Sequence, residues 1–271
     1  MVAESSRQAG RLVFAAGPLS GATIVVTRPA ATAQALRRRA RSLGGTVVSL
    51  PGVILRRAPA AAATALRAAQ DADVVIFVSP AAVRFAFALR RNLRFARHAS
   101  VCAIGLATRR ALLLRGVRQV AAPAADHQDS EGLLALPPLR GVRGKRVVII
   151  GAPGGRELLA QALRSRRARV DEIHVYERLP PRFGRGRLAG LERAAAPLLT
   201  LISSAEVLGN LRERLPLPLY ARLAAGDVIV SSARLAELAR SSLFGRVHVA
   251  ASPAPGDLLR AAIAALAQHR L

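Results

Sequence analysis

Hydroxyl-bearing and glycine residues recur at six places where a short apolar run is followed by a helical pattern. The N–H groups at such a helix start can bind a carboxylate or a phosphate. A Ser or Thr there also caps its own helix, and for any single turn this local role suffices. Six turns in one chain nevertheless favour a shared anion-binding cleft. The turns are Thr27-Arg28-Pro29, Ser79-Pro80, Gly105-Leu106-Ala107-Thr108, Gly151-Ala152-Pro153-Gly154-Gly155, Ser203-Ser204 and Ser231-Ser232.

Tyr176 is one of two tyrosines and lies in an extended segment rather than in a helical pattern. A phenol at this place could donate a hydrogen bond or a proton to a leaving group. It could equally be an amphipathic side chain at a domain edge, and both interpretations stay open.

Cofactor and metal motifs are weak. The loop 151–155 loosely resembles a nucleotide loop but lacks the Gly-x-Gly-x-x-Gly spacing, and the chain has no Gly-Lys-Ser/Thr. The five histidines show no metal-ligand spacing, and Cys102 is the single cysteine. The residues therefore give no support to a bound dinucleotide, ATP or a metal site.

The elements that must position these turns alternate between short β-branched runs and helical patterns. This alternation indicates βαβ units and parallel sheets with helices on both faces. Ten strands are too many for one compact sheet, so we predict two sheets of about five. The predicted strands are 24–27, 46–50, 74–78, 101–104, 119–121, 147–150, 170–176, 200–202, 227–230 and 247–250.

A weak internal repeat supports two similar α/β domains. Residues 77–83 are echoed by 201–207, and both segments read as a strand, a Ser and a helix start. The extended segments 50–55 and 173–178 occupy equivalent places in the two halves, so we predict that both cross between domains.

The composition of the chain allows a second class of function. The 271 residues include 41 basic and 16 acidic side chains, for a net charge of +25, and Lys145 is the only lysine. This charge keeps a non-catalytic RNA or other polyanion binder open as an alternative, although a biased composition would also explain it. Aromatic residues are only 3%, too few for single-strand stacking platforms. The 52% hydrophobic content excludes a disordered chain.

The composition also bears on the cellular compartment of the protein. The single Cys102 excludes an intramolecular disulfide and fits a reducing compartment. We predict no transmembrane helix and no export signal, which leaves a periplasmic-type binding protein with little support.

Seven short segments, in this order and spacing, resemble those of the uroporphyrinogen-III synthase family. The resemblance runs from about residue 22 to the end of the chain. The segments are 26–29, 77–83, 104–108, 129–134, 144–147, 154–158 and 175–178.

The resemblance implies two similar Rossmann- or flavodoxin-like α/β domains with parallel sheets, joined by a two-stranded connector. The first domain would be discontinuous, formed by 22–50 plus 180–266, and the second would be 56–172. Residues 51–55 and 173–179 would be the connectors. Residues 1–21 have no counterpart, and we expect a disordered extension there.

The resemblance also implies a reaction. The linear tetrapyrrole hydroxymethylbilane would lose water and cyclise to uroporphyrinogen III with inversion of its D ring, in the interdomain cleft. A cytoplasmic, monomeric lyase of haem biosynthesis without cofactors is implied, with no nucleic-acid or membrane partner. Transient contact with hydroxymethylbilane synthase is a further hypothesis.

The resemblance also implies roles for individual residues of this sequence. Tyr176 matches the tyrosine that assists hydroxyl departure, Thr108 matches the threonine of a Gly-x-x-Thr turn, and Arg28 matches an arginine whose role could be structural. Ser79 and Ser203 match the hydroxyls of paired serine turns. The other predicted substrate-binding residues are Gly105, Gly154, Gly155, Ser204, Ser231 and Ser232.

Two departures from the family pattern weaken the carry-over. Many members have Asn where Ala81 stands, so a side-chain donor is missing at this position. The second Gly-x-x-Thr turn is replaced by residues 230–234, where Ser231 or Ser232 would have to supply the hydroxyl.

Overall fold

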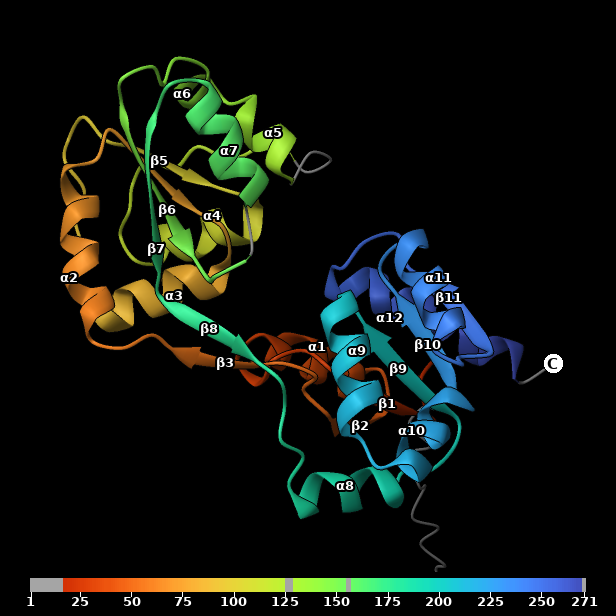
Figure 1. Ribbon diagram of the computed structural model, residues 1–271. Helices are drawn as coiled ribbons and strands as arrows, with labels where there is room; N and C mark the ends of the chain where they lie inside the picture. Colours follow the sequence, from red (N-terminus) through yellow and green to blue (C-terminus); the bar gives the residue numbers. More distant parts are fainter. Residues whose placement is uncertain (1–16, 125–128, 155–156, 270–271) are drawn as a thin grey trace, which may run out of the picture. The chain divides into compact units, whose positions relative to one another are not determined.

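The chain forms two compact units, each built on a parallel sheet (Figure 1). The computed structural model describes residues 17–124, 129–154 and 157–269. Unit 1 comprises the described residues up to Ile54 together with those from Pro180 onward, and unit 2 comprises Leu55–Leu179. The predicted α/β class with parallel sheets is confirmed.

Unit 1 contains a five-stranded sheet in the order β11-β10-β9-β1-β2, with every pair parallel. Because β1 lies between β2 and β9, the winding direction reverses there, and such switch points are where open α/β sheets bind ligands. The strands are β1 (Thr23–Val26), β2 (Thr46–Ser49), β9 (Leu198–Ile202), β10 (Asp227–Val230) and β11 (Arg246–Val249). The helices are α1 (Ala30–Ser42), α8 (Arg185–Glu192), α9 (Ala205–Arg214), α10 (Leu217–Ala224), α11 (Ala233–Ser241) and α12 (Pro255–Gln268).

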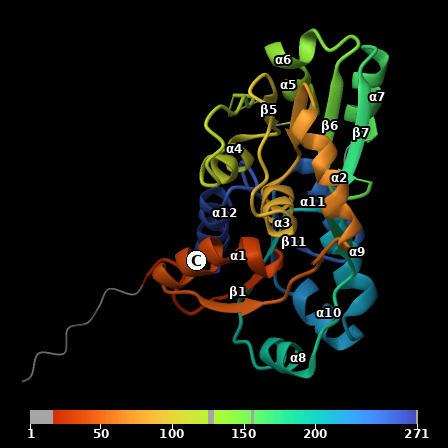
Figure 2. The ribbon, with the colours of Figure 1, turned by 90° about the vertical axis from the view of Figure 1, so that its left-hand side faces the viewer.

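The core of unit 1 explains its continuous apolar strands. All four residues of β1 are buried, as expected for a strand covered on both faces. The helices α1 and α12 lie next to each other (Figure 2). Their residues Leu36 and Leu259 belong to one core cluster with Ile24 and Leu201 of the sheet. The helices α10 and α11 contact β10 outside this cluster.

Unit 2 contains a four-stranded parallel sheet in the order β5-β4-β6-β7. Here β4 lies between β5 and β6, so the winding reverses at β4 as it does at β1. The strands are β4 (Val74–Phe77), β5 (Ser100–Ala103), β6 (Arg146–Gly151) and β7 (Arg169–His174). The helices are α2 (Ala61–Ala68), the 3-10 turn η1 (Ala69–Asp71), α3 (Pro80–Leu89), α4 (Leu106–Leu113), α5 (Ser130–Leu134), α6 (Pro137–Arg140) and α7 (Glu157–Ser165).

Alternate side chains of β4 enter two separate cores. Val75 and Phe77 pack with residues of α2, α3 and α4, whereas Val74 and Ile76 pack with residues of α5, α6 and α7. The first of these cores also contains Tyr176. A second, two-stranded sheet pairs β3 (Ile54–Arg57) with β8 (Tyr176–Leu179), and Tyr176 is the first residue of β8.

Three predicted segments differ from the structure. Residues 119–121 contribute only a bridge between Ala121 and Cys102, and Pro123, which lacks an N–H for a ladder, lies two residues later. The predicted strand 170–176 is two strands, and Ile173 pairs with Ile150 in the sheet of unit 2. The start of the expected connector 173–179 therefore belongs to β7. Residues 54–57 form β3, whereas the sequence had indicated an extended connector that ended at residue 55.

The expected disordered extension is wrong in its last part. Residues 1–16 lie outside the described residues, but residues 18–21 form a turn. Leu19 is fully buried in the core of unit 1, and its N–H donates to the Leu43 carbonyl at 2.9 Å. Burial of this leucine fixes the turn because the apolar side chain is removed from water. Within the ranges described here, no helix is both long and apolar enough to cross a membrane.

Candidate active site

The switch point of unit 2 places a serine and a tyrosine hydroxyl in contact. Ser79 is the N-cap of α3, and its Oγ accepts a hydrogen bond from the Ala82 N–H at 3.0 Å. The phenol oxygen of Tyr176 lies 3.1 Å from the same Oγ. Pro80 favours the helix start because its fixed φ suits the first helical position. The cap and the tyrosine thus share one oxygen at the carboxyl end of β4.

Packing fixes the ring of Tyr176. The residue is 4% exposed, and its ring stacks on Phe85 of α3 with 5.3 Å between centroids and 18° between planes. The Arg84 guanidinium lies 4.5 Å from the Phe85 centroid. Burial lowers the pKa of Arg84, and its electrostatic coupling to Tyr176 opposes this effect. The phenol of Tyr176 is therefore oriented by its stack on Phe85, and the Arg84 cation lies over the Phe85 ring.

Hydrogen-bond chemistry gives the pair two arrangements. The Ser79 Oγ has two lone pairs and one proton, and the Ala82 N–H occupies one lone pair. Ser79 can accept the phenol proton in its second lone pair, or donate its own proton to the phenol oxygen. In the second arrangement the Tyr176 proton can be given to a substrate oxygen. The pair can thus serve as a proton donor whose resting state is already hydrogen-bonded.

The other predicted turns of unit 2 do not all present their side chains. Gly105 is the N-cap of α4 without a side-chain cap, and Thr108 in the first turn of this helix is only 1% exposed. The Thr108 side chain lies inside the unit, so its role as a substrate ligand stays a prediction. Gly154 is exposed with a φ of +71°, a conformation that glycine tolerates best. Gly155 lies outside the described residues.

A close approach brings the ends of β4 and β6 together. A Cβ added to Gly151 would lie 2.6 Å from Cγ2 of Val78, the residue just before Ser79. The Val78 N–H donates to the Ile150 carbonyl at 3.2 Å. The glycine at position 151 is therefore required by packing beside the switch point, rather than by a nucleotide.

Serine caps recur at two strand ends of unit 1. Ser204 caps α9 by accepting from the Val207 N–H, and Ser232 caps α11 by accepting from the Leu235 N–H, both at 3.3 Å. Ser203 and Ser231 each lie one residue earlier, after β9 and β10. The sequence repeat aligned Ser79 with Ser203, but the residue that caps like Ser79 is Ser204. The shift has a simple cause. The repeat pairs Phe77, the last residue of β4, with Leu201, but β9 continues one residue further to Ile202. Because two residues lie between strand and helix in both cases, the cap of α9 also falls one residue later.

Arg28 has a structural contact at the switch point of unit 1. Its guanidinium donates to the Pro253 carbonyl, and burial lowers its pKa. The preceding Thr27 is buried and donates from Oγ1 to the Leu201 carbonyl at 2.6 Å, which joins the ends of β1 and β9. Arg28, Ser203 and Ser204 therefore follow adjacent strands at one edge of the sheet.

Asn210 is a residue that the sequence reasoning missed. Its Nδ2 donates to the Gly52 carbonyl at 2.8 Å, and the Gly52 N–H donates to the Thr27 carbonyl at 2.8 Å. A Cβ on Gly52 would lie 2.6 Å from Cγ1 of Val207, so the segment 50–52 packs directly on α9. The sequence signal that could have pointed to Asn210 is a polar amide next to Leu211, on the apolar side of the helix predicted to follow Ser203-Ser204.

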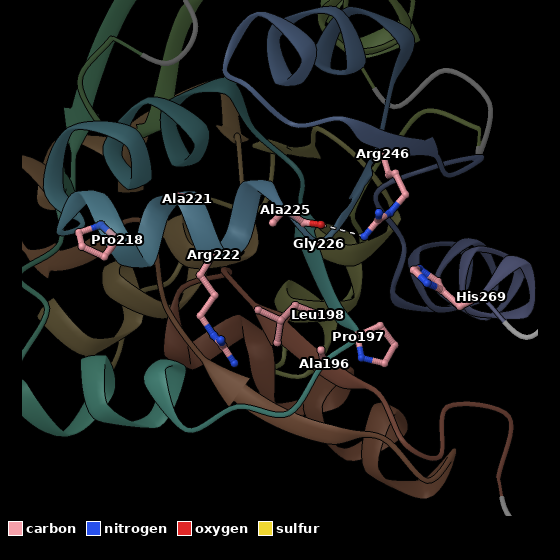
Figure 3. A pocket seen from close by; sticks show the side chains of 10 residues that line it. All are labelled: Ala196, Pro197, Leu198, Pro218, Ala221, Arg222, Ala225, Gly226, Arg246 and His269. Carbon is pink, nitrogen blue, oxygen red and sulfur yellow. Dashed lines mark hydrogen bonds between the residues drawn. The ribbon is translucent and has the colours of Figure 1, made fainter.

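A hollow of about 830 Å³ in unit 1 lies at the opposite edge of the sheet (Figure 3). It is lined at the strand starts by Leu198, Gly226 and Arg246, and His269 faces it from the end of α12. It is therefore separated from the serine caps by the length of the strands.

Behind this hollow lies a buried carboxylate. Asp227 is 1% exposed and lies 2.8 Å from His248 Nε2 and 2.7 Å from His269 Nε2. Burial raises the pKa of Asp227, but the hydrogen bonds with His248 and His269 and the charge of Arg246 outweigh burial, so the net pKa is lowered. This network fastens the end of α12 to β10. Among residues 17–124, 129–154 and 157–269 no group of three or more His, Cys, Asp or Glu side chains could hold a metal ion.

Parallel sheets whose strands end in serine-capped helices define an α/β protein with helix starts suited to anionic ligands at its strand ends. The family model described as uroporphyrinogen-III synthase HemD matches residues 34–260. The chain belongs to the uroporphyrinogen-III synthase family. Its activity is that of this family, a cyclising lyase of tetrapyrrole biosynthesis.

The match to two relatives extends over nearly their whole length. The uroporphyrinogen-III synthase of Salmonella typhimurium is 32% identical over 245 residues, which span 88% of this chain and 99% of the relative. The uroporphyrinogen-III synthase of Escherichia coli is 30% identical over 251 residues, again 88% of this chain and 99% of the relative. These relatives give no support to the RNA-binding alternative.

Solved structures agree on the fold. A mutant uroporphyrinogen III synthase of Thermus thermophilus matches with a TM-score of 0.58 at 21% identity, over 91% of this chain and 99% of that chain. The uroporphyrinogen-III synthetase of Helicobacter pylori matches with a TM-score of 0.59 at 13% identity, over 89% of this chain and 98% of that chain. At these identities the likeness concerns the fold alone.

Proposed function

We propose that the chain converts hydroxymethylbilane to uroporphyrinogen III, with loss of water and inversion of the D ring, and that Tyr176 is the proton donor. The observation that supports this assignment is the 3.1 Å contact of the Tyr176 phenol with Ser79 Oγ at the start of α3. A phenol that is stacked, buried and already hydrogen-bonded loses little entropy when it meets the substrate hydroxyl.

The first chemical step is departure of the substrate hydroxyl. The C–O bond breaks with its electron pair going to oxygen, and the Tyr176 proton completes the water molecule. The substrate pyrrole N–H supplies the proton that restores the phenol, which leaves a neutral azafulvene. Ser79 donates to the phenol oxygen during this step, which stabilises the charge that develops there.

Ring closure then depends on holding the chain ends. The substituted carbon of the D ring, which carries the bridge to ring C, attacks the azafulvene methylene and forms a spiro-pyrrolenine. The bond from this carbon to the ring C methylene then breaks and leaves an azafulvene on ring C. The unsubstituted α-carbon of the D ring attacks that methylene and loses its proton, which closes the macrocycle with the D ring inverted. The enzyme's task is to exclude direct closure, which gives the uninverted type I isomer. Orientation of the two chain ends accounts for this selectivity because closure is intramolecular.

Carboxylate binding belongs to the serine and glycine turns in this proposal. Hydroxymethylbilane carries eight carboxylates, and helix starts bind such groups through backbone N–H donors and the helix dipole. We assign these contacts to the turns at Ser79, Gly105, Gly154, Ser203–Ser204 and Ser231–Ser232. Arg28 holds the loop that follows β1 through Pro253 and serves the site indirectly.

Compartment and partners belong to the same proposal. A reduced cysteine fits a cytoplasmic protein. The supporting observation is Cys102, the single cysteine, which is fully buried as a free thiol. We further propose that the protein is a monomer, and that it receives hydroxymethylbilane from hydroxymethylbilane synthase because this substrate is unstable.

A coupled isomer assay tests the function. Hydroxymethylbilane generated in place is incubated with the purified protein, and the products are oxidised and separated as type I and type III uroporphyrins. We expect type III to predominate with the protein and type I without it. Product consisting only of type I in the presence of folded protein would reject the proposal.

A further inference from the structure

Five arginines surround a hollow of about 760 Å³ in unit 2, which we call the arginine hollow. It lies between the segment that follows α3 and the segment that follows α4. No acidic side chain lines it within the described chain. The five arginines are Arg91, Arg94, Arg97, Arg115 and Arg118.

The floor of the hollow is apolar and anchored. Phe95 packs edge-on against the fully buried Phe77, with 6.0 Å between centroids and 75° between planes. Phe87 is 6% exposed and lies under Arg115, whose Cζ is 5.8 Å from the ring centroid. Leu93 is 4% exposed beside them. The arginines therefore project from segments that are fixed to the core of unit 2.

Some arginines elsewhere in the protein have acidic partners, but within the described residues those of the hollow form no ion pair. Arg146 and Arg164 each form an ion pair at 3.0 Å, with Asp171 and Glu172. No such pair joins an arginine of the hollow to an acidic side chain of the described residues. Asp73, near the adjoining strand start, already accepts from the Arg146 N–H at 2.8 Å and lies 4.0 Å from His98.

Helix dipoles explain only part of this arrangement. A cation is favoured within the last turn of a helix, and the effect falls off beyond it. Arg115 lies close to the end of α4, which stops at Leu113, so the dipole accounts for its position. Arg94 and Arg97 lie well beyond the end of α3 at Leu89. Clustering of cations there raises the free energy of the unliganded unit, since like charges repel.

The hollow is separate from the Tyr176 site. Ser79 lies at the start of α3 and at the carboxyl end of β4, whereas the hollow lies past the end of α3 and before the start of β5 at Ser100. The two sites therefore lie at opposite edges of the sheet of unit 2.

We propose that the arginine hollow is a second binding site for a tetrapyrrole polycarboxylate, which captures substrate or retains product outside the Tyr176 site. A tetrapyrrole combines apolar rings with many carboxylates, and the hollow combines an apolar floor with guanidinium groups that match carboxylates. Its volume falls in the usual range of small-molecule sites. This inference rests on the proposed function for the identity of the ligand.

The test measures binding rather than turnover, using uroporphyrin III, a stable octacarboxylate, as the probe. Isothermal titration compares wild type with the hollow variant R94Q/R97Q/R118Q and with the control variant R38Q/R39Q/R41Q. The control arginines are exposed on α1 of unit 1. Each variant removes three charges, from +25 to +22, so general attraction changes equally.

We expect two uroporphyrins per chain for wild type and for the control variant. The hollow variant should lose one of them, or bind it at least about tenfold more weakly, because three guanidinium–carboxylate contacts are removed. Circular dichroism checks that both variants keep the wild-type fold. Equal weakening in both variants, or an unchanged hollow variant, would overturn the inference.

The isomer assay separates this inference from the proposed function. If wild type makes only type I product, the function is rejected whatever the titration shows. If wild type makes type III product and the hollow variant binds like wild type, only the second site is rejected. At saturating hydroxymethylbilane the hollow variant should still give type III product, since the Tyr176 site is intact.

Discussion

The Tyr176 phenol and the Ser79 hydroxyl lie 3.1 Å apart, although 97 positions separate them in the chain. Ser79 also accepts from the Ala82 N–H, so one oxygen both caps α3 and touches the proposed proton donor. A helix cap fixes its serine rotamer because the Oγ must face the first turn. The phenol is consequently held where the cap places it, which couples the stability of α3 to the geometry of the site.

Replacement of Tyr176 by Phe should slow catalysis without unfolding the protein. The ring would keep its stack on Phe85, but the proton donor would be lost, and we expect a fall in kcat of about 100-fold. Rate and isomer ratio in the coupled assay measure this effect.

The matched control is Tyr220→Phe, at the other tyrosine. Tyr220 donates to the Ser242 carbonyl at 2.6 Å in unit 1, far in sequence from the proposed chemistry. This change should cost about 1 kcal/mol of stability and leave kcat within about twofold of wild type. If both variants reduced kcat alike, Tyr176 would have no special role.

Replacement of Ser79 by Ala should affect both stability and rate. Loss of the cap should lower the free energy of unfolding by about 1 kcal/mol. Loss of the hydroxyl beside Tyr176 should also lower kcat by about tenfold, because the phenol oxygen loses its hydrogen-bond donor. Thermal unfolding and the isomer assay measure the two effects on the same preparation.

Ser232→Ala and Ser79→Thr serve as comparisons for this prediction. Ser232 caps α11 in a similar way, so its replacement should lower the free energy of unfolding by a similar amount, and this variant is compared for stability alone because its turn is assigned to carboxylate binding. Threonine at position 79 keeps a hydroxyl and should restore most of the rate. A Ser79→Thr variant as slow as Ser79→Ala would show that the hydroxyl is not what matters.

Acid should weaken unit 1 through Asp227. The folded pKa of Asp227 is lowered, so its contribution is fully present above the unfolded pKa, roughly 3.9, and is lost as pH falls through the lower folded value. Asp227→Asn should therefore lower stability by about 2 kcal/mol at neutral pH, with the difference shrinking as the pH falls below about 4. Denaturant unfolding at several pH values measures both curves; a difference independent of pH would contradict the argument.

Cys102 should be inert to thiol reagents in the folded protein. Burial raises the pKa of its thiol to about 12, and the side chain is fully buried on β5. Thiolate is the reactive form, so native protein at pH 8 should react with an aromatic disulfide only as unit 2 opens. The rate should rise sharply with denaturant near the unfolding transition. Rapid reaction without denaturant would mean that β5 is accessible in the native state.

The local pattern of the sequence determined the α/β class, the parallel strands and the turns that carry the serines. Strands such as 227–230 were predicted at their observed bounds because short apolar β-branched runs between turn residues have few alternatives. The serine caps follow from the same local rules. The family resemblance, carried by short ordered segments, agrees with the match over residues 34–260.

Tertiary structure alone decided which side chains meet. The sequence could not show that Tyr176 contacts Ser79 or that Thr108 is buried. Each of these depends on strand order and register, which join segments far apart in the chain. The same holds for the arginine hollow, because the arginines of 91–97 and those of 115–118 become neighbours only when α3 and α4 end at the same edge of the sheet. The sequence supplied the +25 charge, and the fold concentrated part of it in a hollow that no described acidic side chain lines.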